Sequence, residues 1–113
     1  MASLLEDYRR HAVAHGVHSF DGDYVACNAA HDAIQQIFLQ LFKAGKAAEL
    51  FSFYDDPDVW VQCWAAAHTL EVDEPRALAK LEQIERTGEP NVSSDAHYTI
   101  EEWKLGNLRF VEP

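Results

Sequence analysis

The sequence predicts an all-α domain, and three observations support this prediction. Apolar residues recur at spacings of three and four along most of the 113 residues, as they do on one face of an α-helix. Serine and aspartate, which favour helix starts, stand before these runs and are twice followed closely by proline. No convincing strand appears, and the nearest candidate is the tail at residues 109–111. We therefore expect five or six helices in a single domain that spans residues 1–113, because no linker-like stretch divides the chain.

The N-terminal half is expected to hold two long helices and a short one. Ser3 opens a capping box for the first helix, and Gly16 supplies its expected end. The second helix starts near residues 21–23 and continues to Gly45, and a short third helix covers residues 46–54. The apolar face of the second helix is expected to carry Tyr24, Cys27, His31, Ile34, Phe38 and Leu41.

The stretch DDPDVWVQCWAAAHTL, residues 55–70, joins three aspartates to a run rich in tryptophan and alanine. Asp55 or Asp56 is the expected N-cap of a helix with Pro57 at its first position. Asp58 would then lie in the first turn, where the positive end of the helix dipole favours a negative charge. The side chains that follow are apolar around most of the helix, so this helix should be buried on more than one side.

The same start by an acid and a proline recurs after a short turn. Asp73 or Glu74 is expected to cap a helix with Pro75 at its first position, and Gly88 ends it. Two helices joined in this way predict an antiparallel hairpin over residues 56–86.

A last helix is expected near the C-terminus. It follows a turn around Pro90, begins at Ser93 or Ser94, and stops at Gly106. Its apolar stripe holds Ala96, Ile100 and Trp103.

The hairpin resembles a HEAT repeat in its Asp-Pro start, its valine, its Ala-Ala pair and its proline-started second helix. HEAT-like repeats usually place an arginine after the valine, and Gln62 stands there in this chain. We therefore expect a compact HEAT-like helical domain and not a long solenoid. The whole chain is also similar to a bacterial family of unknown function, number 2019 among the domains of unknown function. The matching residues are Asn28, Val61, Trp64, Ala65, Ala66, Asp95, Ala96, Thr99, Glu102, Trp103 and Gly106.

The composition is that of an ordinary globular protein, but the charge is strongly negative and uneven. Hydrophobic residues make up 48% of the chain and charged residues 25%, with a net charge of −10. Residues 1–54 hold 6 acidic and 4 basic side chains, a net of −2, whereas residues 55–113 hold 13 and 5, a net of −8. Such a field repels nucleic-acid backbones. The negative charge either serves solubility alone or attracts a basic partner.

Several features predict a cytoplasmic protein that does not bind membranes. The N-terminus carries acids where a signal peptide needs a basic start and an apolar run. The most apolar stretch, residues 37–42, is too short to cross a bilayer. Cys27 and Cys63 each lie within an apolar helical pattern, so we expect reduced core residues and not a disulfide.

Histidine spacing gives the main hint of metal chemistry. His11 and His15 stand four residues apart, which places two imidazoles on one helix face, where they could bind zinc. His18, Asp21 or Asp23 would supply a further ligand. The glutamate of the metalloprotease motif is missing between the two histidines. A metal-binding enzyme or structural protein built on His11 and His15 is the alternative function, and solvent-facing histidines are the simpler interpretation.

The other candidate constellations argue against catalysis. Cys27 and His31 also stand four apart, but an apolar surrounding raises the pKa of a thiol and keeps it unreactive. The adjacent acids 73–74 and 101–102 point about 100° apart on a helix, so neither pair forms a catalytic dyad. The sequence has no phosphate-binding glycine loop, nucleophile elbow or paired-cysteine motif. We expect neither an enzyme nor a cofactor.

The acidic second half predicts a surface for a basic protein partner. Small acidic bacterial helical domains of this kind resemble immunity proteins, which bind and block a cognate toxin, and the negative field would steer a basic toxin toward this half. Acidic groups stand at both ends of the first hairpin helix, about 20 Å apart. Trp60 is expected either to pack in the core or to be a partly exposed anchor. The candidate partner-binding residues are Asp55, Asp56, Asp58, Trp60, Glu71, Asp73 and Glu74.

Overall fold

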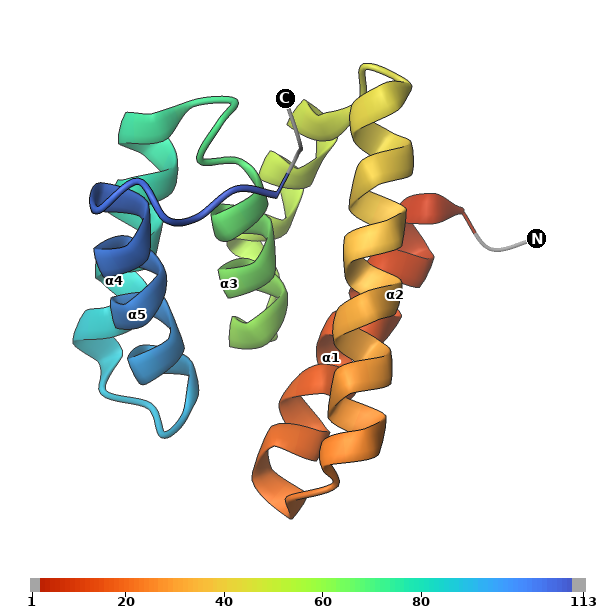
Figure 1. Ribbon diagram of the computed structural model, residues 1–113, viewed down its shortest axis with the longest axis vertical. Helices are drawn as coiled ribbons and strands as arrows, with labels where there is room; N and C mark the ends of the chain where they lie inside the picture. Colours follow the sequence, from red (N-terminus) through yellow and green to blue (C-terminus); the bar gives the residue numbers. More distant parts are fainter. Residues whose placement is uncertain (1–2, 111–113) are drawn as a thin grey trace.

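The computed structural model describes residues 3–110, and it confirms the all-α prediction. The elements are α1 (Leu4–Asp21), α2 (Tyr24–Lys43), the 3-10 helix η1 (Ala47–Asp55), α3 (Val59–His68), α4 (Glu74–Thr87) and α5 (Val92–Lys104). Helices α1 and α2 run in opposite directions, as do α3 and α4 and then α4 and α5, whereas η1 separates α2 from α3 and these two helices run in the same direction (Figure 1). No strand forms within residues 3–110; Arg109 and Phe110 are irregular, and Val111 of the candidate tail lies outside the described residues.

Helix α3 occupies the centre of the molecule. It contacts α1, η1, α4 and α5, and it lies between the α1–α2 pair and the α4–α5 pair (Figure 1). The prediction of a helix buried on more than one side is therefore confirmed. Helices α3 and α4 also form the predicted antiparallel hairpin. The buried residues of α3 are Trp60, Val61, Cys63, Ala65, Ala66, Ala67 and His68.

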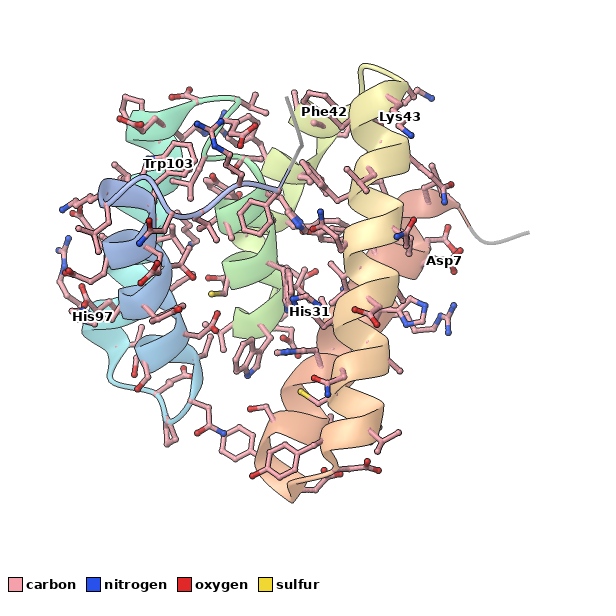
Figure 2. The ribbon with its side chains drawn as sticks, viewed as in Figure 1. Asp7, His31, Phe42, Lys43, His97 and Trp103 are labelled. Carbon is pink, nitrogen blue, oxygen red and sulfur yellow. The ribbon has the colours of Figure 1, made fainter. Side chains whose placement is uncertain are left out.

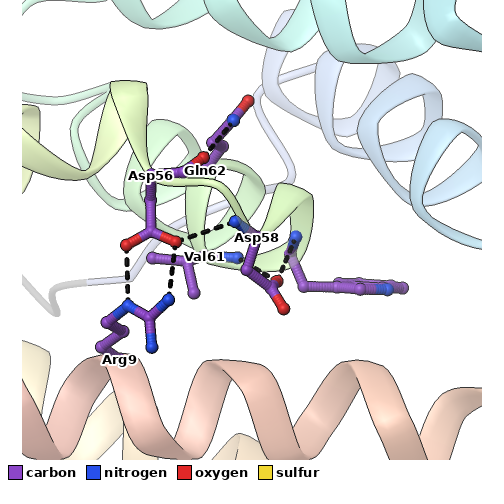
Figure 3. Close-up of polar contacts among 6 residues, drawn as sticks. Arg9, Asp56, Asp58, Val61 and Gln62 are labelled. Atoms are coloured by element: carbon purple, nitrogen blue, oxygen red, sulfur yellow. Dashed lines mark hydrogen bonds and ion pairs between the residues drawn. The ribbon is translucent and has the colours of Figure 1, made fainter.

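The start of α3 differs from the prediction. Asp58, and not one of the two earlier aspartates, is the N-cap, and its Oδ1 accepts the backbone N–H groups of Trp60 at 2.9 Å and Val61 at 3.2 Å (Figure 3). Pro57 precedes the helix and does not occupy its first position. Asp56 still contributes, because its Oδ1 accepts the N–H of Asp58 at 2.9 Å and so orients the cap.

Helix α1 is longer than predicted, because Gly16 does not end it. The helix begins at the expected Ser3 cap and continues to Asp21, where Gly22 in the left-handed region (φ 77°) terminates it. Gly16 is buried in mid-helix against Trp60 of α3, and a Cβ on Gly16 would lie 2.4 Å from Trp60 Cδ1. Glycine thus permits the close approach of two helices here.

The other helix starts agree with the predictions to within two residues. Asp23 caps α2 and Asp73 caps α4, each by accepting a first-turn N–H, and Pro75 lies in the first turn of α4. Helix α5 follows Asn91, whose φ is 68°. The Asn91 side chain donates to the backbone oxygen of Ser19 at 3.1 Å, which joins the start of α5 to the end of α1.

The apolar face of α2 is correct in its second half only. Ile34, Phe38 and Leu41 are buried as predicted, whereas Tyr24 and His31 are exposed. Tyr24 belongs to a group of large apolar side chains, 55–83% exposed, at the end where α1 turns into α2: Val17, Phe20, Tyr24 and Val25. We call this group the hairpin end. In the part of the chain that the structure describes, no helix is long and apolar enough to cross a bilayer.

Candidate functional site

A pocket of about 190 Å³ lies beside α3, and four helices and the C-terminal segment contribute to it. We call it the central pocket. Its ring-bearing and charged lining residues are His15 of α1, His31 of α2, Trp64 of α3, Asp95 and Tyr98 of α5, and Phe110. These residues are far apart in the sequence. The packing of the α1–α2 pair and the α4–α5 pair around α3 brings them together.

Trp64 forms the inner wall of the central pocket. The rings of His15 and His31 meet it edge to face, with centroid distances of 5.2 Å and 5.4 Å. His31 reaches toward α3 from α2 (Figure 2). Burial, with a smaller contribution from His31, lowers the pKa of His15 to about 4, so His15 is neutral at physiological pH. The His15 Nδ1 and Trp64 Nε1 atoms are buried without a hydrogen-bond partner among the described residues.

A buried hydrogen-bonded chain lies behind the pocket and is centred on His68. Burial is the main cause that lowers the pKa of His68 to about 3, so its imidazole is neutral. Its Nδ1 accepts the hydroxyl of Tyr8 at 2.7 Å, and its Nε2 lies 3.0 Å from Oε1 of Gln35. The Gln35 oxygen can only accept, which assigns the imidazole proton to Nε2. Gln35 in turn donates to the backbone oxygen of Phe110 at 2.7 Å and holds the C-terminal segment in place.

The two cysteines are free, as predicted, but only Cys63 is a core residue, because Cys27 is half-buried. Cys63 is buried, and its Sγ lies 3.6 Å from Oδ2 of Asp95, to which the thiol donates. Burial raises the pKa of Cys63, and the charge of Asp95 adds to this effect. The pKa of Cys27 is also raised, mainly by desolvation. Both thiols are therefore protonated at neutral pH.

Two of the three histidines that suggested a zinc site, His15 and His18, make other contacts. His18 Nδ1 lies 3.0 Å from Asp21 of its own helix, and the His15 ring packs against Trp60 as well as Trp64. Over residues 3–110, no group of three or more His, Cys, Asp or Glu side chains is arranged so that it could hold a metal ion.

The first predicted acidic cluster is mostly engaged within the protein. Arg9 of α1 binds the carboxylate of Asp56 through two hydrogen bonds of 2.7 Å and 3.1 Å (Figure 3). Desolvation raises the pKa of Asp56, but the Arg9 bonds and the Asp58 N–H outweigh it and lower the pKa below its ordinary value. Asp58 serves as the α3 cap, which leaves only Asp55 exposed without such a role. Trp60 is 7% exposed, so the expectation of a partly exposed anchor is wrong and the core interpretation holds.

The second predicted cluster lies on the surface, at the turn between α3 and α4. Glu71, Asp73 and Glu74 are all exposed, although Asp73 also caps α4. The indole of Trp103 on α5 donates to Oε2 of Glu74 at 2.9 Å, and Figure 2 shows Trp103 beside this turn. Sequence reasoning placed Trp60 beside the acids; Trp103 is the tryptophan that contacts them. Val72 and Leu105, 43% and 69% exposed, add apolar area.

The Arg9–Asp56 pair leads to a stability prediction. Replacing Arg9 with methionine should lower the free energy of unfolding by about 1 kcal/mol, because a bidentate partner is lost from a carboxylate with a side chain only 9% exposed. The matched control is Arg10→Met, since Arg10 is 68% exposed and pairs with Asp7 within one helix; its expected cost is under about 0.5 kcal/mol. Urea unfolding measures both. Equal losses would contradict a special role for the Arg9–Asp56 pair.

Fold and site together define a small all-α domain in which two helical hairpins flank a central helix and a ring-lined pocket. No model of a known protein family matches the chain, and neither a curated protein nor a solved structure matches it. The likeness to HEAT repeats and to family 2019 therefore stays a prediction from the sequence.

Proposed function

We propose that this chain is a non-catalytic protein-binding module with a basic partner, and that it acts as an immunity protein that binds and neutralises a cognate toxin. The observation that carries the proposal is the surface made by the α3–α4 turn and the end of α5. We call it the acidic surface, and its residues are Glu71, Val72, Asp73, Glu74, Trp103 and Leu105.

The acidic surface has the composition of a binding site for a basic protein. Specific interfaces combine an aromatic or aliphatic centre with a polar rim, and tryptophan is enriched among the residues that contribute most to affinity. Trp103 and Leu105 supply the apolar part. Glu71 and Glu74 line one hollow with Trp103 and Arg109, and Asp73 is exposed on the same turn. The net charge of −8 on residues 55–113 would also accelerate the encounter with a positively charged partner. Asp55, which is exposed at the other end of α3, can extend the interface.

The immunity role is tested with the product of the adjoining gene, because an immunity protein is expected to be encoded beside its toxin. We expect that product to stop growth when it is expressed alone, and growth to return when this chain is expressed with it. A neighbour that is harmless and does not bind the purified chain would overturn the immunity role.

The acidic surface is tested by association kinetics with the same partner. Raising the salt from about 50 to about 300 mM should slow association at least about tenfold, because the Debye length shrinks below the distance over which the charges steer. The double change Glu71→Lys with Glu74→Lys should slow it further. Glu49 on η1 is also exposed, so Glu49→Lys is the control for a charge reversal outside the acidic surface. If Phe20→Ser at the hairpin end abolishes binding while the lysine variants bind normally, the hairpin end is the interface and the acidic surface is not.

A further inference from the structure

The central pocket combines several aromatic rings with a single charge. Rings of His15, His31, Trp64, Tyr98 and Phe110 surround it, and Asp95 is its only acidic residue. Among the described residues that line it there is no lysine or arginine. Asp95 forms no ion pair within residues 3–110; its side-chain partner there is the uncharged thiol of Cys63 at 3.6 Å. The pocket therefore holds a carboxylate without a counter-charge.

We propose that the central pocket binds an organic cation, an ammonium or guanidinium group on a small apolar body, with Asp95 as the counter-charge and Trp64 and Tyr98 as its ring walls. Aromatic rings attract cations through their electron-rich faces, and the attraction grows where water is excluded. A carboxylate beside such rings adds a direct Coulomb attraction and can accept hydrogen bonds from an N–H donor.

The chemistry of the lining disfavours the other ligand classes. An anion would meet the carboxylate of Asp95 and find no basic side chain to bind it. A neutral apolar ligand would remove water from Asp95 and give it no hydrogen bond in return. Desolvation raises the pKa of Asp95, the Cys63 thiol and the charge of His31 act to lower it, and the residue as a whole is exposed. A bound cation would act in the same direction as those two groups and favour the carboxylate. The neutral imidazole of His15 adds no opposing positive charge.

The volume of the central pocket and the exposure of its rings limit the kind of ligand that it can bind. A volume of about 190 Å³ is below the roughly 300–1,000 Å³ of pockets for drug-sized ligands, and it suits a small amine or a single side chain. Tyr98 is 63% exposed and His31 is also exposed, so both rings are free to move against a ligand. Phe110, another lining residue, is held by the bond from Gln35 to its backbone oxygen. The cation can come from a free amine or from a lysine or arginine of a bound protein.

The test uses the purified chain alone, so its outcome does not depend on the proposed function. Choline and arginine amide are titrated by calorimetry and by tryptophan fluorescence, with butyrate as the anionic probe. We expect saturable binding of the cations and none of butyrate. Asp95→Asn, which keeps an acceptor for Cys63, should weaken binding at least about tenfold, and Tyr98→Ala about 3- to 30-fold. Tyr24→Ala is the matched control, because Tyr24 is 79% exposed at the hairpin end and does not line the pocket.

Each result decides between defined outcomes. Failure of both cations to bind the folded chain overturns the proposal, and so does an equal loss of affinity in the Tyr24→Ala variant, which would place binding elsewhere. Thermal melting of Asp95→Asn confirms that a lost affinity is not a lost fold; if that variant unfolds, the affinity of Tyr98→Ala decides the question, because its side chain is exposed. Choline that binds at least as well as arginine amide identifies a free amine as the source. Arginine amide that binds much better identifies a protein side chain.

Discussion

Acidification from about pH 7 to about pH 4 is expected to remove about 3 kcal/mol from the free energy of unfolding through His68 alone. In the folded protein the pKa of His68 is lowered to about 3, whereas in the unfolded chain it returns to about 6.5. Between these values the unfolded state binds one more proton than the native state. Stability is therefore complete above about pH 6.5 and is lost as the pH falls toward 3.

Neighbouring groups modify this acid response in predictable directions. His15, with a pKa of about 4, adds a loss of the same sign, and its partial exposure makes that loss smaller. Asp95 acts in the opposite direction, because its raised pKa lets the native state take up a proton before the unfolded state does. Asp56, whose pKa is lowered, loses its contribution only as the pH falls through its ordinary range and below, so it adds little to the loss between about pH 6.5 and about pH 4.

Urea unfolding at a series of pH values measures this effect. The wild-type free energy should fall by about 1.4 kcal/mol per pH unit for each extra proton that the unfolded state binds. In His68→Gln the slope should decrease by about one proton, whatever the variant costs at neutral pH. A wild-type stability that stays constant from about pH 6.5 to about pH 4 would show that burial does not hold His68 neutral in the folded protein.

Local helix chemistry is the part of the structure that could be predicted from the sequence. The caps at Ser3, Asp23 and Asp73 depend on a side chain and an N–H two or three residues away, so the pattern of residues is sufficient to recognise them. The hairpin over residues 56–86 follows from two such starts and a short turn. One of the differences was also local, at Pro57, where two neighbouring aspartates were equally good candidates for a cap and a third was used.

The candidate site could not be predicted, because its contacts join residues far apart in the chain. Tyr8 and His68 are separated by 60 residues, and Asn91 and Ser19 by 72. Helical periodicity shows which face of a helix is apolar, but the meeting of two faces depends on packing angles that side-chain shapes decide. Trp60 illustrates this limit: its position beside three aspartates suggested a surface anchor, while its ring is in fact buried against α1.

The contact between Gly16 and Trp60 leads to the second large effect. Gly16→Val is expected to lower the free energy of unfolding by about 3 kcal/mol, because added methyl groups enter the space of the Trp60 ring. A Cβ would lie 2.4 Å from Trp60 Cδ1 and 2.8 Å from Cγ, and a ring that is 7% exposed has little room to retreat. Valine has a better helix propensity than glycine, but this offsets only about 0.5 kcal/mol of the loss in stability.

A double-mutant cycle separates this steric clash from a general effect on α1. Trp60→Leu alone should destabilise the protein by leaving a cavity, but combined with Gly16→Val the total loss should be smaller than the sum of the two, since the smaller side chain makes room for the valine. Ala29→Val at an exposed position of α2 is the control for adding a β-branched residue to a helix, with an expected cost of about 0.5 kcal/mol. Chemical unfolding of the four proteins of the cycle and the control gives the coupling. Strictly additive losses would mean that Gly16 and Trp60 do not touch in solution. The contact between α1 and α3 would then differ from the one described, and so would the position of His15 in the central pocket.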